Sequence, residues 1–525
     1  MSADMSTDRV TIRRALIGVS DKSGAAELAA ALQRHGVEIL STGNTKATLQ
    51  QAGIEVKAVE DFTGFPEILE GRVKTLHPKI HGGILARREA SVHRAQVKEH
   101  GLELIDLVVV NFYPFERTVA REGVTLEDAI ENIDIGGPAL ARAAAKNHTG
   151  VVVIIDPADY AALVQELDAN DASVSAETRW RLARKAFARV AAYDCAIANY
   201  LGAHAGDQPE PLGETFAIAL ERAQKLRYGE NPHQAGALYG DLLKIAEQLH
   251  GRELSFNNVM DIDSAINLMR DFGDYKQSVV AILKHNTPCG IGVAATLKQA
   301  WDKAFATDPD SPFGGIIISN RAWDLELARA VDELFTEVLI GPDFEPGVLE
   351  FLRKKKNRRL IRFHPEAAVR GQLDLKRVLG GLLVQTPDLS IEDARAAKVV
   401  TKRAPTEAEL RAMNFGIRAA KHIKSNAIAF VLEDRTLAVG GGATSRIDPV
   451  YAAREKAARL GVSLKGSVLV SEALFPFPDG PTLAGEAGAT AIAQPGGAMR
   501  DSEVIAAADA LGLAMVFTGV RHFRH

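Results

Sequence analysis

Three cations stand close together among glycines in the stretch from Glu70 to Gly83. Arg72, Lys74 and Lys79 share this short segment with Thr75 and two histidines. Cations held this close repel one another unless an anion binds between them, and glycines let backbone N–H groups approach that anion. The segment therefore predicts an anion site, and a phosphate is the simplest ligand.

The surrounding sequence predicts a parallel sheet that positions this site. Strands are expected over 14–20, 37–40 and 54–59 with helical periodicity between them, and further strands over 107–111 and 151–155. Ligands of parallel α/β sheets bind at the carboxyl ends of the strands. Side chains suited to a phosphate monoester stand at those ends or in the cationic segment: Ser20, Lys22, Thr42, Gly43, Thr45, Arg72, Lys74 and Thr75.

A second group of polar residues in this half could move protons. Tyr113 follows a strand, Asp134 precedes a helix, and that helix carries Arg142 and Lys146. Each has an ordinary alternative, because Tyr113 could pack in the core, Asp134 could cap the helix and Lys146 could lie on the surface. Only their joint occurrence indicates chemistry.

The second half offers a lysine and a histidine at the end of a strand. Lys284 and His285 follow an apolar run over 279–283. A neighbouring positive charge disfavours the protonated imidazole, which suits a histidine acting as a general base. A solvated Lys-His pair is the alternative. Asn426, between a helix and a strand, could hold a carbonyl oxygen.

Composition excludes several classes of protein. The chain has 525 residues, 46% of them hydrophobic and 25% charged, with a net charge of -5. These values are typical of a globular protein of several domains and give no general attraction to nucleic acid or acidic membranes. The two cysteines, Cys195 and Cys289, exclude a disulfide framework. With no apolar signal or membrane-spanning run, we expect a cytoplasmic protein without nucleic-acid or membrane partners.

The stretch from Gly206 to Gly213 is rich in proline and glycine, and it predicts the main domain boundary. We expect an α/β domain over 1–205, ending in a long helix, and a second α/β region over 206–525. The dense charge run over 353–359 is interpreted as a solvated helix face rather than a nucleic-acid patch.

Known metal and nucleotide motifs are missing. Pro288-Cys289 lacks the second cysteine of the zinc deaminases, and His285 lacks a glutamate two positions later. The P-loop, the G-x-S-x-G elbow and H-E-x-x-H do not occur either. We therefore expect no catalytic metal.

Several motifs together closely resemble the bifunctional purine biosynthesis family, in which AICAR formyltransferase is joined to IMP cyclohydrolase. They occur in the order of that family and span nearly the whole chain: Gly71-Arg-Val-Lys-Thr-Leu-His-Pro78, Asn111-Phe-Tyr-Pro-Phe115, Asp134-Ile-Gly-Gly137, Ala144-Ala-Lys-Asn-His148, Leu226-Arg-Tyr-Gly-Glu-Asn-Pro-His-Gln234, Lys284-His285, Lys424-Ser-Asn426, Gln494-Pro-Gly-Gly497 and Arg521-His-Phe-Arg-His525.

The resemblance implies a fold and an activity. The amino-terminal domain would be methylglyoxal-synthase-like, and the transformylase region would consist of two cytidine-deaminase-like subdomains. The enzyme would transfer a formyl group from 10-formyltetrahydrofolate to AICAR and then close the product, FAICAR, to IMP with loss of water. The reduced folate is thus a cosubstrate, potassium is a possible ligand, and a homodimer is expected.

The resemblance also implies roles for individual residues of the transformylase. His285 would manage the amine proton, while Lys284 and Asn426 would stabilise the developing oxyanion. Eight further residues would bind nucleotide or folate: Arg227, Tyr228, Asn258, Phe313, Gly314, Glu337, Arg521 and Phe523.

In the cyclohydrolase, the resemblance implies that Lys74, Tyr113, Asp134 and Lys146 polarise the formyl oxygen and move protons. The substrate would be held by Ser20, Lys22, Thr42, Gly43, Thr45, Arg72, Thr75, Asn111 and Arg142.

Three places depart from the family pattern. Asn44 stands where a second glycine is usual, and we expect it in a left-handed conformation. Asn286-Thr287 and Ala443-Thr444 replace more usual pairs near the inferred transformylase site. Two alternatives stay open, a phosphate-binding lyase of the methylglyoxal synthase type and a non-catalytic nucleotide-binding module.

Overall fold

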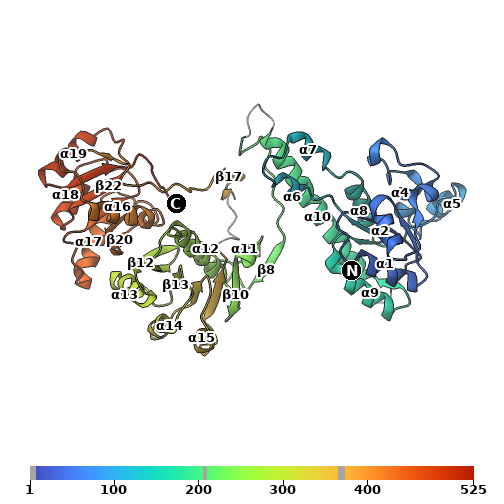
Figure 1. Cartoon of the computed structure of the whole chain (residues 1–525), viewed down its shortest axis with the longest axis horizontal. Helices are drawn as coiled ribbons and strands as arrows, with labels where there is room; N and C mark the ends of the chain where they lie inside the picture. The colour runs from blue at the N-terminus through green and yellow to red at the C-terminus, as the bar shows by residue number, and fades with distance from the viewer. Residues whose placement is uncertain (1–7, 205–209, 365–372) are drawn as a thin grey trace. The chain divides into compact units, whose positions relative to one another are not determined.

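The structure is a computed structural model that describes residues 8–204, 210–364 and 373–525. Its contacts divide the chain into two compact units, residues 1–221 and 222–525 (Figure 1). The predicted boundary between residues 205 and 206 lies outside the described residues and stays a prediction.

The first unit is built on a five-stranded parallel sheet, as the sequence predicts. Its strand order is β4-β3-β2-β5-β6. The strands are β2 (Arg14–Val19), β3 (Glu38–Ser41), β4 (Lys57–Ala58), β5 (Leu107–Asn111) and β6 (Val152–Ile154). Strand β4 is shorter than the predicted strand over 54–59, because helix α3 already begins at Val59.

Both faces of this sheet are buried, which explains its nearly continuous apolar strands. Ala15, Ile17 and Val19 pack on one side with helices α1 and α9, whereas Leu16 packs on the other side with α8 and α10. The helices are α1 (Ala25–Arg34), α2 (Gly43–Gln51), α3 (Val59–Thr63), α4 (Pro78–Leu85), α5 (Ser91–Glu99), α6 (Phe115–Val119), α7 (Leu126–Glu131), α8 (Gly136–Lys146), α9 (Tyr160–Ala169) and α10 (Ala176–Ala203). Strands β1 (Arg9–Thr11) and β7 (Ser173–Ser175) form a separate antiparallel pair.

The second unit contains a twelve-stranded sheet made of two repeats of one topology. The order is β10-β15-β14-β13-β11-β12 followed by β20-β19-β21-β22-β23-β18. In each repeat an antiparallel hairpin, β11-β12 or β19-β20, is followed by three strands that are mutually parallel, and an antiparallel edge strand completes it. The second unit thus consists of two similar repeats, and the expected likeness of each to cytidine deaminase stays a prediction.

The first repeat, drawn in green to ochre in Figure 1, precedes the second, drawn in orange to red. Its elements are β10 (Ala246–His250), α12 (Phe256–Asp271), β11 (Ser278–Lys284), β12 (Thr287–Ala294), α13 (Leu297–Thr307), β13 (Ile316–Ser319), α14 (Leu325–Asp332), β14 (Val338–Gly341), α15 (Val348–Leu352) and β15 (Arg359–Phe363). Those of the second are β18 (Lys398–Val399), α16 (Glu407–Ala420), β19 (Ile428–Leu432), β20 (Arg435–Gly440), α17 (Asp448–Leu460), β21 (Val468–Ser471), α18 (Asp479–Glu486), β22 (Ala491–Gln494), α19 (Asp501–Ala510) and β23 (Ala514–Phe517).

Short elements flank the repeats. They are the hairpin β8 (Arg222–Leu226) and β9 (Gly236–Tyr239), helix α11 (Leu242–Ile245), and the hairpin β16 (Asp374–Val378) and β17 (Gly381–Gln385).

The two repeats share a glycine at the same place in their topology. A Cβ atom on Gly292 of β12 would lie 2.2 Å from the carbonyl oxygen of Ala300 in α13. A Cβ atom on Gly440 of β20 would lie 2.1 Å from the carbonyl oxygen of Pro449 in α17. In each repeat, therefore, only glycine lets the helix after the hairpin pack directly on the backbone of the strand.

The prediction of a solvated helix over 353–359 is wrong. Helix α15 ends at Leu352, a turn follows, and Arg359 begins β15. The side chain of Arg358 is 1% exposed and forms an ion pair of 2.7 Å with Asp332. Part of the charge run is therefore used inside the fold, because a partner carboxylate compensates its burial.

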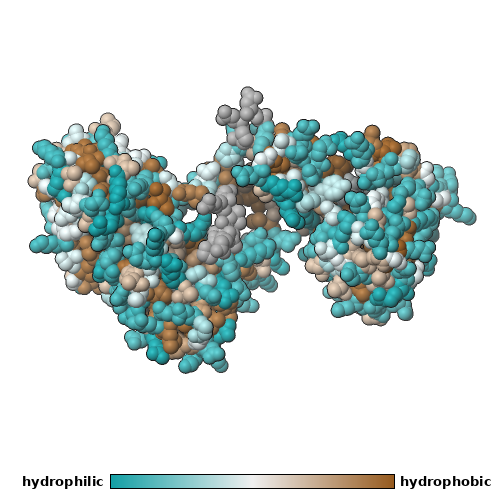
Figure 2. Space-filling model, viewed as in Figure 1, coloured by the Kyte–Doolittle hydropathy of each residue, from teal (hydrophilic) through white to brown (hydrophobic). Residues whose placement is uncertain are grey.

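No described helix is long and apolar enough to cross a membrane. The face drawn in Figure 2 is mostly hydrophilic, with hydrophobic residues in small groups between the polar ones.

The start of helix α16 depends on one buried carboxylate. Thr406 and Glu409 form a capping box, and Arg403 donates to both carboxylate oxygens of Glu409 at 2.8 and 3.0 Å. Burial acts to raise the pKa of Glu409, but the hydrogen bonds from Arg403 and from the Thr406 N–H outweigh it and lower the pKa from 4.5 to about 2.

We predict that Glu409→Gln lowers the free energy of unfolding of the second unit by about 2 to 3 kcal/mol at pH 7. Because the folded-state pKa is depressed, this stability is present above pH 4.5 and is lost as the pH falls toward 2. Urea unfolding at several pH values measures it. Glu433→Gln, which breaks an exposed pair with Arg411, is the control and should change little. Equal losses in the two variants would contradict the assignment.

Candidate functional site

The end of strand β2 is fixed by the side chain of Asn111. Its Oδ1 accepts hydrogen bonds from the N–H groups of Ser20 at 2.6 Å and Asp21 at 2.9 Å, and its Nδ2 donates to the carbonyl of Asp21 at 2.8 Å. Lys22 follows, with Nζ 3.4 Å from the carbonyl oxygen of Ser20. The carboxyl ends of β2 and β5 are therefore locked together, as expected for a ligand site between neighbouring parallel strands.

Thr45 is buried, and its hydroxyl is used by the fold. The hydroxyl donates to the carbonyl of Val19 at 2.9 Å and accepts from the N–H of Val19 at 3.2 Å. Only 6% of Thr45 is exposed. The residue thus joins helix α2 to the end of β2, so any effect on a ligand would come from holding that turn.

The loop before α2 lies against the cationic segment. Gly43 has φ of +53°, and a Cβ atom placed on it would lie 3.3 Å from Nζ of Lys74. Lys74 also forms an ion pair of 3.1 Å with Glu67. The expected left-handed conformation of Asn44 is wrong, because Gly43 takes the positive φ and Asn44 lies in the first turn of α2.

Asp134 sits at the start of helix α8. Its carboxylate accepts from the N–H groups of Gly137 at 2.8 Å and Tyr113 at 3.2 Å, and its own N–H donates to the hydroxyl of Tyr193 at 2.8 Å. Burial raises the pKa of Asp134 above its usual value, although the two accepted hydrogen bonds oppose the shift. A carboxyl group whose pKa is raised by burial is a candidate for exchanging protons with a substrate.

Neighbouring residues complete this part of the site. Tyr113 is 46% exposed, so it does not pack in the core. The hydroxyl oxygen of Thr75 lies 3.3 Å from the position of a Cβ atom on Gly136, at the start of α8. Because Lys74 and Thr75 are consecutive, the cationic segment connects the Gly43 loop with the Asp134 end of α8.

Three other predicted residues of this unit are exposed. Lys146 is exposed at the far end of α8, about 15 Å along the helix from Gly136. Arg142 is exposed and lies over the ring of Phe187 at 5.8 Å. Arg72 is also exposed and is paired with Glu131.

In the second unit, Lys284 ends β11 and His285 begins a strained turn. His285 and Asn286 have φ of +53° and +64°, a left-handed conformation that is uncommon for side-chain-bearing residues. The turn is held by Asp261, whose Oδ1 accepts from the N–H of Asn286 at 2.7 Å. Nζ of Lys284 donates to the carbonyl of Phe313 at 2.9 Å, which brings the Phe313–Gly314 loop to the same place.

Helix α12 connects this turn with further predicted residues. Nδ2 of Asn258 donates to Glu337 at 3.0 Å, and Glu337 forms an ion pair of 3.6 Å with Arg359. Sequence reasoning missed Asp261 and Ser264, although Asn258, Asp261 and Ser264 recur every three residues on one helix. That spacing of polar residues on a largely buried helix was the available signal.

The carboxamide of Asn426 is engaged on both sides. Its Nδ2 donates to the carbonyls of Ala443 at 2.9 Å and Thr444 at 3.2 Å, and its Oδ1 accepts from Arg446 at 2.5 Å. Arg446 is paired with the buried Glu472. Nδ2 of Asn426 must therefore give up one of its two bonds before it can donate to an oxyanion.

A cavity of about 310 Å³ lies beside Lys284 and His285, and both repeats line it. Its walls are Lys284, His285, Thr287, Pro288, Cys289, Thr307, Asp308 and Ser311 of the first repeat, with Lys424, Val439, Gly441, Gly442 and Lys456 of the second. Three lysines face one carboxylate, Asp308, which is paired with Lys456. The cavity thus favours anionic or electron-rich ligands.

Two further features limit the chemistry of this cavity. Burial raises the pKa of the Cys289 thiol to about 12, so the thiolate needed for a nucleophile is disfavoured. Among the residues that the structure describes, no group of three or more His, Cys, Asp or Glu side chains is arranged to hold a metal ion.

The remaining predicted residues form two arginine-aromatic pairs. The guanidinium of Arg227 lies 4.8 Å from the ring centre of Tyr228 and donates to its hydroxyl at 3.0 Å. The guanidinium of Arg521 lies 4.0 Å from the ring centre of Phe523. Such pairs present a cation and a flat apolar surface together, as a nucleotide phosphate and base require.

Comparison with known proteins gives matches over both units. The family described as MGS-like domain matches residues 24–139, and the family described as AICARFT/IMPCHase bienzyme matches residues 144–456. The bifunctional purine biosynthesis protein PurH of Chloroflexus aurantiacus is 54% identical over 512 residues, which cover 98% of each chain. The chain belongs to the AICARFT/IMPCHase bienzyme family.

Other members of the bienzyme family match equally completely. The PurH proteins of Pelodictyon phaeoclathratiforme and Chlorobium phaeobacteroides are each 51% identical, over 98% of this chain and 99% of their own. The chain is thus a bifunctional enzyme of purine biosynthesis, and the predicted activity is favoured over the lyase and the non-catalytic module. The expected methylglyoxal-synthase-like domain at the amino terminus is confirmed as well.

We predict that Thr45→Val lowers the free energy of unfolding of the first unit by about 1 to 3 kcal/mol, because both backbone groups of Val19 lose their partner. Urea unfolding measures the change. Thr48→Val is the matched control, since that hydroxyl bonds only within its own helix, to the carbonyl of Asn44. A Thr45→Val protein as stable as the control would refute the joining role of Thr45.

Proposed function

We propose that this chain performs the last two steps of IMP synthesis at two sites, one in each unit. Formyl transfer from 10-formyltetrahydrofolate to AICAR takes place beside Lys284 and His285, and closure of FAICAR takes place beside Lys74 and Asp134. The observation that carries the proposal is the full-length match to the bienzyme family together with a cavity at Lys284 and His285 that both repeats line.

In formyl transfer, the 5-amino nitrogen of AICAR attacks the formyl carbon. His285 takes the proton from that nitrogen, and the formyl oxygen gains negative charge. Lys284 stabilises this oxyanion, with Asn426 after one of its present bonds is exchanged. The carbon–nitrogen bond to the folate then breaks, and N10 of tetrahydrofolate leaves with the proton that His285 took from the amine. Positioning and electrostatics supply the catalysis, since no covalent enzyme intermediate is needed.

Binding residues follow from the same arrangement. Arg227, Tyr228, Arg521 and Phe523 bind the nucleotide, through cations for its phosphate and rings for its base. Asn258 of α12 donates to Glu337, and the carbonyl of Phe313 accepts from Lys284. These three residues and Gly314 border nucleotide or folate. The cosubstrate is a reduced folate.

In ring closure, Lys74 polarises the formyl oxygen of FAICAR, and Asp134 and Tyr113 move protons while water is lost. The phosphate is held near Ser20, Lys22, Thr42, Gly43, Arg72 and Thr75, in a turn that Thr45 and Asn111 fix. Arg142 and Lys146, which lie farther along α8, are proposed to take part in the same reaction. A cytoplasmic homodimer is the assembly we propose.

We predict that His285→Ala abolishes formyl transfer and leaves closure of supplied FAICAR intact, because the two sites lie in different units. Chromatography of FAICAR and IMP over time measures both steps. His364→Ala, on a partly exposed histidine of the same unit, is the control and should keep both activities. Loss of both steps in a folded His285→Ala protein would refute the two-site assignment.

The reverse result is expected for Lys74→Ala. FAICAR should accumulate, because formyl transfer continues while the cation beside Gly43 that polarises the formyl oxygen is gone. The same chromatography, started from AICAR and 10-formyltetrahydrofolate, measures the accumulation. Lys98→Ala, an exposed lysine of α5, should release IMP as the unchanged protein does. Normal IMP output from Lys74→Ala would contradict the role of Lys74.

A further inference from the structure

The segment from Arg521 to His525 presents two different faces. Arg521 and Phe523 are exposed, with the guanidinium of Arg521 over the ring of Phe523. His522 is 5% exposed, and Arg524 also turns inward. Residues thus alternate between an outer face that carries the proposed nucleotide-binding pair and an inner face that anchors the segment.

The backbone of Arg524 is paired with the residue before Asn426. Its N–H donates to Oγ of Ser425 at 3.0 Å, and its carbonyl accepts from the N–H of Ser425 at 2.9 Å. The position of Asn426 is therefore tied directly to this segment.

The guanidinium of Arg524 reaches the other repeat. Its Nη2 donates to Oγ of Ser264 on α12 at 3.0 Å, and that hydroxyl donates to Oδ1 of Asn286 at 3.3 Å. Asn286 is the second residue of the turn that carries His285. One side chain thus connects the segment beside Asn426 with the turn of His285, across two repeats.

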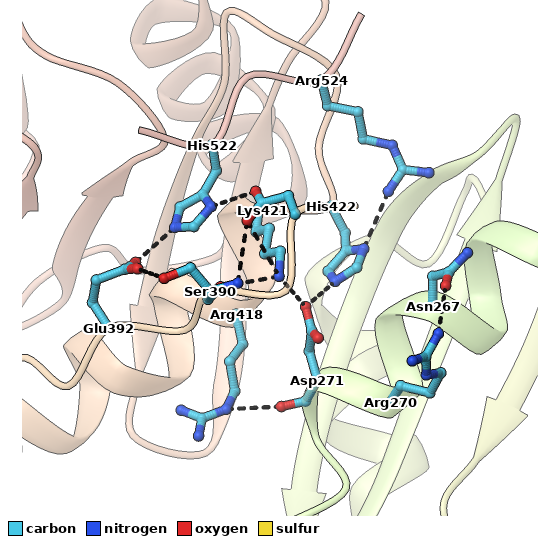
Figure 3. Close-up of polar contacts among 11 residues, drawn as sticks. Asn267, Arg270, Asp271, Ser390, Glu392, Arg418, Lys421, His422, His522 and Arg524 are labelled. Carbon is cyan, nitrogen blue, oxygen red and sulfur yellow. Dashed lines mark hydrogen bonds and ion pairs between the residues drawn. The ribbon is translucent and has the colours of Figure 1, made fainter. Parts of the chain in front are cut away.

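A second branch fixes the orientation of the guanidinium. Nη1 of Arg524 lies 3.1 Å from Nδ1 of His422, and Nε2 of His422 lies 2.7 Å from Oδ2 of Asp271 (Figure 3). Burial lowers the pKa of His422, although Asp271 opposes the shift, so the neutral ring is favoured. A neutral ring that donates from Nε2 to Asp271 leaves Nδ1 free to accept from Arg524.

The same buried network holds the rest of the segment. Lys421 forms an ion pair of 3.0 Å with Asp271 and donates to the carbonyl of Ser390 at 3.0 Å (Figure 3). His522 lies 2.6 Å from both Asp388 and Glu392. The anchoring face of the segment is therefore fixed at two points, one through Arg524 and one through His522.

We propose that Arg524 is a positioning residue for formyl transfer, which holds the turn of His285 and the segment of Asn426 in register. The inference rests on the proposed function of the second unit. Both arms of a planar guanidinium are needed, because Ser264 and His422 lie in different elements and must be reached at the same time. A lysine has a single ammonium group and cannot replace this fork.

The test compares Arg524→Lys with the unchanged chain in the formyltransferase reaction at saturating AICAR and 10-formyltetrahydrofolate. We expect kcat for formyl transfer to fall about 100-fold, the size expected for a small displacement of reacting groups. Closure of supplied FAICAR should be unchanged. Arg358→Lys, which alters a buried arginine paired with Asp332 instead of a member of this network, is the control and should keep kcat.

A double-mutant cycle with Ser264→Ala separates positioning from general destabilisation. Ser264→Ala removes only the branch to Asn286 and should lower kcat in the same direction. The loss in Ser264→Ala/Arg524→Lys should be smaller than the product of the two single losses, because both act through one connection. Thermal unfolding of each variant reports whether the second unit is folded.

The outcomes are distinct. Unchanged kcat in folded Arg524→Lys, or fully multiplicative losses in the cycle, would overturn the positioning role while the proposed function stands. If the unchanged chain forms neither FAICAR nor IMP from AICAR and 10-formyltetrahydrofolate, the proposed function is wrong and this inference is wrong with it.

Discussion

The second unit depends on the contact between strands β12 and β20, which joins two repeats into one sheet. The N–H of Val293 donates to the carbonyl of Asp434 at 2.8 Å, and the N–H of Ile291 donates to the hydroxyl of Thr436 at 2.9 Å. Few backbone hydrogen bonds join β12 to β20, because Gly292 and Arg435 are the one pair of residues in register between these two described strands.

Ion pairs across the junction support these few bonds. Lys303 of α13 is paired with Asp434 at 2.5 Å, and Lys456 of α17 is paired with Asp308. These pairs fix the helices of the two repeats on either side of the junction. The cavity beside His285 exists because residues of both repeats meet there.

Lysines that are gathered in one place repel one another, and this repulsion explains which groups lie next to them at the two sites. Lys284, Lys424 and Lys456 line one cavity, and Lys74 lies against the loop of Gly43. The positive charges of these lysines are only partly compensated by neighbouring groups. Lys284, for example, donates to a backbone carbonyl and not to a carboxylate. This leaves a net attraction for anionic substrates, which full neutralisation would remove.

Buried polar groups in this enzyme serve two different purposes. Asp134 has few partners and a raised pKa, which suits a group that exchanges protons. Arg524, His422 and Asp271 satisfy one another, which suits groups that hold a position.

The sequence by itself determined the local elements and most of the candidate site. Apolar runs predicted the parallel sheet, strand ends indicated where Ser20 and Lys284 would lie, and the cationic segment singled out Lys74, because burial and side-chain type act over a few residues. The prediction for 353–359 was wrong because the partner of Arg358 lies 26 residues away in sequence. Only the tertiary structure decided which distant residues meet. Ser264 and Arg524 are separated by 260 positions, and their contact arises from the packing of two repeats rather than from any local pattern.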